Sequence, residues 1–119
     1  MINKVVLCGN LTRDPELATT NSGKKVCNYT IAVSYGGGED SQTFFFNIKS
    51  WNAQAEVIYN HCKKGDKITV VGALTQRSYE KDGKKITVTE ILAQDVEFMS
   101  RREKQREEME EITDEEMPF

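Results

Sequence analysis

The 119-residue sequence lacks the features of membrane-spanning and exported proteins. Its longest apolar runs are only a few residues, as in Val5-Val6-Leu7-Cys8, whereas a helix that crosses a bilayer needs about 20. The segment Met1-Ile2-Asn3-Lys4 has no basic region followed by an apolar stretch and a small-residue cleavage site, so no secretory signal is expected. We therefore predict a cytoplasmic protein without a membrane segment.

Cysteine and histidine are also scarce. Cys8, Cys27 and Cys62 are widely spaced with no CxxC pair, which argues against a disulfide framework and a zinc site. Each lies in an apolar pattern that predicts a small core residue. His61 is the single histidine, and its neighbour Cys62 would point in another direction on a helix, which is poor geometry for a nucleophilic pair. We predict no metal site and an inert, surface-exposed His61.

Catalytic motifs are missing as well. There is no P-loop, no GxSxG, no HExxH and no carboxylate cluster set against a histidine base. The acids of residues 1–106 are scattered through turns and beside lysines, where exposed, solvated charges are the rule. The sequence therefore predicts a protein that is not an enzyme, with no catalytic residues and no cofactor.

The charge that is present is unevenly distributed. Residues 1–106 hold 16 Lys and Arg against 12 Asp and Glu, a net charge of +4, while residues 107–119 hold seven acids and no base. A mildly basic body with an acidic tail suggests a polyanion-binding domain joined to a segment that repels the same polyanion or engages another partner.

Hydrophobic patterning predicts five strands and one short helix. Runs rich in β-branched and aromatic residues predict strands over 2–12, 25–34, 43–51, 68–75 and 86–98, the last with a break near Ala93-Gln94. Asp82-Gly83 predicts a hairpin turn. Between the third and fourth strands, apolar residues at i, i+3, i+4 and i+7 predict a helix over about 53–63, with Asn52 as N-cap and Gly65 as its stop. The apolar residues of that helix are Ala55, Ile58, Tyr59 and Cys62.

This order of elements predicts an all-β fold, a five-stranded OB-fold barrel over residues 1–99 with the helix plugging one end. A β-sandwich usually needs about seven strands, so the barrel is preferred. From Ser100 the chain has good helix formers but little apolar stripe, which predicts a solvated, disordered acidic tail. We divide that tail into a short charged linker (100–111) and a tip (112–119).

Aromatic and basic side chains are interleaved along the predicted strands. Single-stranded nucleic acid is bound by aromatic faces on which unpaired bases stack, at about 1–3 kcal/mol per base, and by cations that follow the phosphates. Most strand aromatics are core residues. Alternation divides the third strand into one face with Phe45, Asn47, Lys49 and Trp51 and another with Phe44, Phe46 and Ile48. We predict that the first face, which is both polar and aromatic, is exposed.

Five segments together resemble, in order and spacing, the bacterial single-stranded DNA-binding protein family over about residues 1–99. They are INKVVLCGNLTRDPEL, GKKVCNYTIAV, TFFFNIKSWNAQAE, KKGDKITVVGAL and QRSYEKDGKK. The end of the chain, DEEMPF, resembles the acidic tip of that family, which finishes in Pro-Phe.

This resemblance implies a homotetramer that wraps single-stranded DNA without strong sequence preference in replication, recombination and repair, in association with the nucleoid. It places Phe45, Trp51 and Tyr79 at base-stacking positions. Many members have a further aromatic near the end of the second strand, where this chain has Tyr35 and then three glycines. The full set predicted to bind single-stranded DNA is Lys4, Tyr35, Phe45, Lys49, Trp51, Arg77, Tyr79, Lys84 and Lys85.

The resemblance also implies that the tip recruits replication and repair proteins. Its apolar residues are not needed by a merely solubilising tail, and a terminal Phe offers a ring and a carboxylate to a basic, apolar pocket. The predicted docking residues are Asp114, Glu115, Glu116, Met117, Pro118 and Phe119. An OB-fold accessory module for protein or structured RNA is the alternative, and a nuclease or other enzyme is a distant third.

Overall fold

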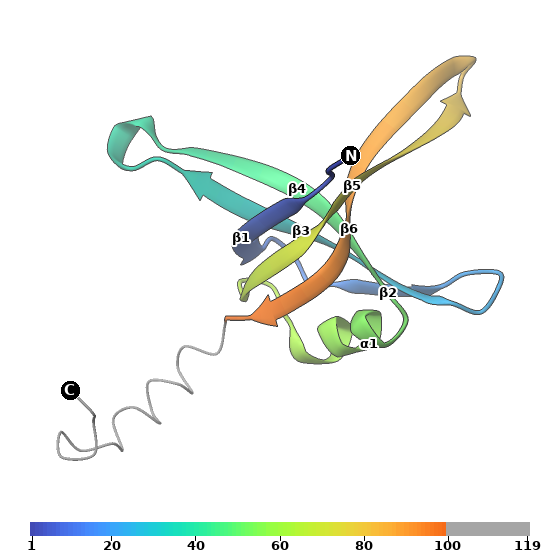
Figure 1. The fold of residues 1–119 in the computed structure, drawn as a ribbon, viewed down its shortest axis with the longest axis horizontal. Coiled ribbons are helices and arrows are strands. Elements are labelled where there is room, and N and C mark those ends of the chain that lie inside the picture. Colours follow the sequence, from blue (N-terminus) through green and yellow to red (C-terminus); the bar gives the residue numbers. More distant parts are fainter. Residues whose placement is uncertain (100–119) are drawn as a thin grey trace.

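The computed structural model describes residues 1–99, which form six strands and one α-helix (Figure 1). Chain order is β1 (Val5–Leu11), β2 (Glu16–Thr19), β3 (Lys25–Tyr35), the short 3-10 turn η1 (Gly38–Asp40), β4 (Gln42–Trp51), α1 (Asn52–His61), β5 (Lys67–Lys81) and β6 (Lys84–Phe98). The strands are ordered β1-β5-β6-β4-β3-β2 in one sheet, and β1 also pairs with β3. That extra pairing closes β1, β3, β4, β5 and β6 into the predicted five-stranded barrel.

Strand β2 was not predicted, because residues 13–23 suggested only turns and a polar loop. It pairs antiparallel with β3, with Leu17 opposite Cys27. Leu17 is the one partly buried side chain among its four residues, so the segment has no alternating pattern to detect. Backbone pairing with β3 creates this strand.

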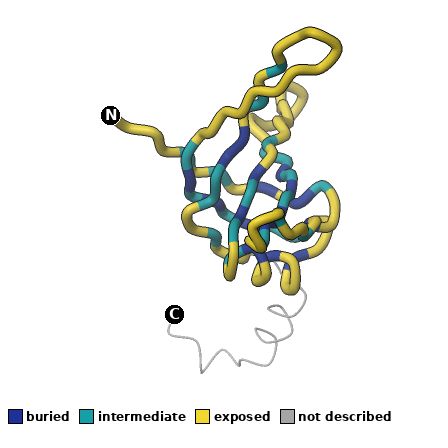
Figure 2. Tube along the Cα trace, turned by 90° about the vertical axis from the view of Figure 1, so that its right-hand side faces the viewer, coloured by how far each residue is buried: buried dark blue, intermediate teal, exposed yellow. Residues whose placement is uncertain are grey.

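Two long hairpins extend from the barrel in different directions (Figure 1). Strands β3 and β4 pair from Val26↔Trp51 out to Tyr35↔Gln42, and we call residues 33–45 the β3–β4 arm. Strands β5 and β6 pair out to Lys81↔Lys84, and we call residues 74–89 the β5–β6 arm. Exposed residues dominate the outer parts of both arms (Figure 2).

The β5–β6 hairpin confirms two predicted features. Asp82 and Gly83 both have positive φ, +53° and +77°, as a two-residue hairpin turn of this type requires. The pairing passes from Val71↔Asp95 to Gly72↔Ala93, so Gln94 is the extra residue of a β-bulge at the position of the predicted break. Gly72 is required at this bulge, because a Cβ there would collide with the backbone carbonyl of Leu92.

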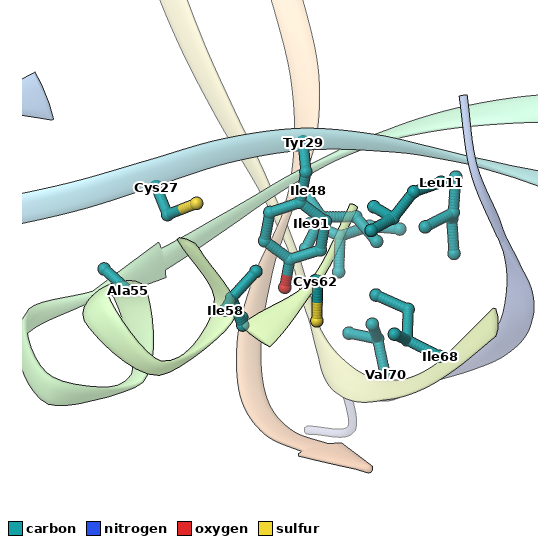
Figure 3. Packing of buried hydrophobic residues seen from close by; sticks show 11 residues of the cluster. Leu11, Cys27, Tyr29, Ile48, Ala55, Ile58, Cys62, Ile68, Val70 and Ile91 are labelled. Carbon is teal, nitrogen blue, oxygen red and sulfur yellow. The ribbon is translucent and has the colours of Figure 1, made fainter. Parts of the chain in front are cut away.

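The core fills the barrel and the space beneath α1 (Figure 3). From α1, Ala55 and Ile58 are fully buried and pack toward β3. Inside the core the Tyr29 and Ser50 hydroxyls are joined by a hydrogen bond of 2.8 Å. The buried cluster is Leu11, Cys27, Tyr29, Ile31, Ile48, Ala55, Ile58, Cys62, Ile68, Val70 and Ile91.

Several details of the sequence prediction were wrong. Cys8 is exposed, because on β1 it alternates with the buried Gly9 and so points outward. Tyr59 is 48% exposed, since α1 meets the sheet chiefly along β3 and only a narrow helical stripe is covered. Asn52 is the first residue of α1, at φ +56°, and makes no side-chain cap. Gly65 does not stop the helix, which ends at His61 before an extended Cys62.

No helix among residues 1–99 has the length and apolar character that a bilayer crossing needs. The predicted linker (100–111), the predicted tip (112–119) and the predicted disorder of this acidic tail lie outside the described residues.

Candidate nucleic-acid interface

The outward side of β4 carries the aromatic and polar residues that alternation predicted. Phe45 is 66% exposed, whereas Ile48 and Ser50, which point to the other side, are buried. Pairing with β3 widens this surface, since Thr30 lies opposite Asn47 and donates a 2.9 Å hydrogen bond from its hydroxyl to the Asn47 Oδ1. We call this surface the β3–β4 face, and its residues are Asn28, Thr30, Ala32, Phe45, Asn47, Lys49 and Trp51.

The β5–β6 arm contributes a third aromatic and a cation. Arg77 and Tyr79 lie on one side of the arm, because they are two residues apart on β5. The Arg77 guanidinium carbon is 5.7 Å from the centroid of the Tyr79 ring, within the range of a cation–π interaction. Lys84 lies on the same side, opposite Lys81, whereas Lys85 lies opposite Glu80 on the other side.

A polar groove of about 340 Å³ joins the two parts of the surface. Arg77 and Glu90 from the β5–β6 hairpin line it together with residues of the β3–β4 face. The remaining wall comes from the segment that leads into β2. The residues around the groove are Arg13, Glu16, Asn28, Tyr29, Thr30, Asn47, Ile48, Lys49, Arg77 and Glu90.

Two of the three cations around the groove, Lys49 and Arg77, contact one acid, Glu90. Arg77 donates its Nε–H to the Glu90 Oε1 at 2.7 Å, and the Lys49 Nζ lies 3.5 Å from the same oxygen. Glu90 is only 9% exposed, and its two partners compensate the cost of burying a carboxylate. These three side chains together carry two positive charges and one negative charge.

Three charged residues of the groove, Arg13, Glu16 and Glu90, lie outside the set predicted to bind DNA. Glu90 lies on the strand side that Ile86 and Val88 mark as apolar by alternation, and a charge at such a position must find a partner, which is a signal that was present in the sequence. Arg13 was read only as part of a turn. It lies 4.0 Å from Glu16 at an exposed position, where an ion pair contributes little to stability.

Some predicted DNA-binding residues lie elsewhere. Tyr35 pairs with Gln42, so it shares the side of Phe44 and not that of Phe45, although it is 74% exposed. Lys4 donates a 2.9 Å hydrogen bond from its Nζ to the Gln94 side chain at the β-bulge. Five of the predicted residues thus line the groove, lie on the β3–β4 face or lie beside Arg77 on the β5–β6 arm: Phe45, Lys49, Trp51, Arg77 and Tyr79.

Cys27, whose thiol has a shifted pKa, lies in the core and not in the groove. Burial raises the pKa of the Cys27 thiol to about 11, and the neighbouring Cys62 adds to this shift. Within residues 1–99, no three His, Cys, Asp or Glu side chains gather as a metal ion would require. The chemistry available in the groove is hydrogen bonding, ion pairing and aromatic stacking.

Residues 2–99 match the sequence profile of the Single-strand binding protein family. A single-stranded DNA-binding protein of Halalkalibacterium halodurans is 43% identical over 107 residues, covering 86% of this chain and 63% of the relative. One of Bacillus cereus is 41% identical over 106 residues, covering 86% of this chain and 62% of the relative. The chain thus spans less than two thirds of the length of these two relatives.

A solved structure, described as a Plasmodium falciparum SSB complex with ssDNA, superposes with a TM-score of 0.77 at 23% sequence identity. The superposition covers 84% of this chain and 96% of that one. This similarity confirms the predicted OB fold.

Proposed function

This chain belongs to the single-strand binding protein family, and from that premise we propose that it binds single-stranded DNA without strong sequence preference and without catalysis. The observation that carries the proposal is the exposed β3–β4 face beside the polar groove. There the rings of Phe45 and Trp51 lie on the same side of β4 as Lys49. Stacking surfaces next to cations are what unpaired, charged strands require.

Stacking and charge have separate tasks in this proposal. Every base has a π-face, so Phe45, Trp51 and Tyr79 accept any base, each at about 1–3 kcal/mol. Lys49 and Arg77 meet the phosphates, and Arg13 at the groove wall adds a third cation. Binding of this kind protects and organises unpaired DNA during replication, recombination and repair.

The path of the strand extends along the β5–β6 arm, where Lys84 lies on the side of Tyr79. Lys4, Tyr35 and Lys85 face other directions, so their contact with DNA requires a strand that wraps around the molecule. We propose that such wrapping takes place on a homotetramer. Sedimentation equilibrium is expected to give four times the 13.5 kDa chain mass, and a monomer at micromolar concentration would contradict the tetramer.

The tip is the proposed docking segment for replication and repair proteins. Its acids would meet a basic pocket, and its terminal ring and carboxylate would enter it. The docking residues are Asp114, Glu115, Glu116, Met117, Pro118 and Phe119.

Fluorescence anisotropy of a labelled oligo-dT, titrated with the full chain at several salt concentrations, tests the proposed DNA binding. We expect tight binding, poor competition by unlabelled duplex, and weakening by salt without complete loss. No binding at low salt would overturn the proposal. Stronger binding of a structured RNA than of oligo-dT would favour the accessory-module alternative, and metal-dependent cleavage of the oligonucleotide would favour an enzyme.

A further inference from the structure

Glu90 is a buried acid in the groove assigned to a polyanion. A carboxylate repels phosphate, so Glu90 in the groove would weaken the proposed DNA binding if it acted alone. Its role is understandable if it acts on the cations beside it. Glu90 lies on β6, Arg77 on β5 and Lys49 on β4, so the three side chains connect three strands. We call them the charge triad.

Both cations of the charge triad use the same oxygen of Glu90. The Nε–H of Arg77 points to Oε1 at 2.7 Å, and the ammonium of Lys49 lies 3.5 Å from that atom. Side-chain exposure is 27% for Lys49 and 54% for Arg77, so both cations are still accessible to a ligand. Among the described residues, the Arg77 side chain has no acceptor besides Glu90, which leaves its Nη donors for a phosphate.

The pairing also fixes where the guanidinium lies. Arg77 has its Nε held by Glu90 and its guanidinium carbon 5.7 Å from the centre of the Tyr79 ring. A base stacked on Tyr79 would therefore bring its phosphate to a cation that is already oriented. The charge triad as a whole carries one net positive charge, although it contains two cations.

We propose that Glu90 is a positioning residue that orients Arg77 and Lys49 and limits the charge triad to neutralising one phosphate in place of two. The inference rests on the proposed binding of single-stranded DNA. If Glu90 acts in this way, the affinity for DNA at low salt is lower than the number of groove cations suggests. The dependence of that affinity on salt concentration is also less steep. A strand held in this way is released more readily.

The variant Glu90→Gln tests the proposal, because glutamine retains the shape and a carbonyl acceptor for Arg77 but removes the charge. In oligo-dT titrations at several salt concentrations, we expect tighter binding at low salt. The slope of log K against log salt concentration should be steeper by about 0.7, which corresponds to one more phosphate neutralised on a single strand. The matched control is Glu97→Gln, which makes the same charge change at an exposed position of β6 and should leave the slope unchanged.

The double variant Lys49→Gln/Glu90→Gln carries the same net charge in the triad as the wild type. We expect its slope to equal that of the wild type. If Glu90 had no influence on the cations, only the loss of Lys49 would count, and the slope would be shallower by about 0.7. This result decides the question even where Glu90→Gln alone does not fold, and thermal melts report folding for every variant.

Two results would overturn the inference. One is a folded Glu90→Gln with the slope of Glu97→Gln, and the other is a double variant with the shallower slope. Failure of the proposed function looks different, because the wild type itself would then not bind oligo-dT at low salt.

Discussion

Phe44 and Phe45 are neighbours in the chain, yet their rings lie on opposite sides of β4. Only Phe45 is therefore expected to stack on a base. We expect Phe45→Ala and Trp51→Ala each to weaken oligo-dT binding by about 1–3 kcal/mol, because each removes a stacking surface. Phe44→Ala is the matched control, because the Phe44 ring lies on the other side of β4. Anisotropy titrations measure the affinities, and equal losses for Phe44 and Phe45 would contradict the assignment.

The buried Cys27 makes folding stability depend on pH in the alkaline range. Its pKa is raised from 9.0 to about 11, so the folded chain keeps the thiol proton where the unfolded chain loses it. The resulting stability is fully present below about pH 9 and is lost as pH rises toward 11. Burial raises the pKa of Tyr29 as well, which acts in the same direction at higher pH.

Urea unfolding at about pH 8 and about pH 10.5 checks this linkage. The wild type should lose stability between the two values. Cys27→Ala, although less stable at pH 8 because of the cavity it creates, should lose less. The same loss in both proteins would show that the thiol does not cause the dependence.

The positions of single residues were predictable only where strand alternation alone decides them. Phe45, Lys49 and Trp51 follow directly from alternation along β4. The side on which Tyr35 lies depends on its register with Gln42, which the turn at residues 36–41 sets and no local pattern reveals. Arg13 and Glu90 both line the groove because packing brings together segments that are far apart in the chain.

The β5–β6 arm is an element whose length can be changed without touching the core. Deleting residues 79–81 and 84–86 joins Ser78 and Thr87, which already face each other, through the unchanged Asp82-Gly83 turn. We expect the shortened chain to fold, since the removed residues are exposed or half-buried. Its affinity for oligo-dT should fall by at least about 1–3 kcal/mol, because Tyr79 and its neighbouring lysines are lost.

Thermal melts and anisotropy titrations measure the two effects separately. A shortened arm with an unchanged melting temperature and undiminished affinity would show that the arm does not contact DNA. Conversely, the single substitution Tyr79→Ala should reproduce most of the loss if stacking is its main cause.

Strands with a strong hydrophobic pattern were predictable, whereas short elements and the exposed outer half of β5, predicted only over 68–75, were not. Strands β3, β4 and β6 were placed to within two residues of their ends, and the hairpin turn and the bulge followed from Asp82-Gly83 and Ala93-Gln94. Strand β2 depends on pairing with β3 rather than on its own residues. The start of α1 differs because Asn52 adopts a positive φ without capping the helix through its side chain.

On the scale of the whole molecule, the acidic end of the chain has the opposite charge to residues 1–106. Residues 107–119 carry seven acids, so we expect them to compete with DNA for the same cations. Deleting residues 112–119 should leave oligo-dT affinity equal or higher, with the largest increase at low salt. A control that keeps the length replaces Asp114 with Asn and both Glu115 and Glu116 with Gln, and it should act in the same direction. A large loss of affinity on deletion would contradict this expectation.

The barrel architecture could be inferred from the order of the elements, but its closure could not be located in the sequence. The pairing of β1 with β3 involves Asn10↔Ala32 and Leu11↔Ile31, which are 22 and 20 positions apart in the chain. The proposed homotetramer rests on the family resemblance, because interface and core residues have the same composition in the sequence.

The parallel seam between β4 and β6 is one of the two shortest in the barrel, with only two register pairs, Ile48↔Ile91 and Lys49↔Leu92. Lys49 lies on this seam and Glu90 is next to it, so local opening would separate them. A ligand that requires the closed arrangement stabilises it by mass action. Bound DNA should therefore hold β4 and β6 together. Amide hydrogen exchange along this seam should then slow on binding more than exchange at the far end of the β3–β4 arm.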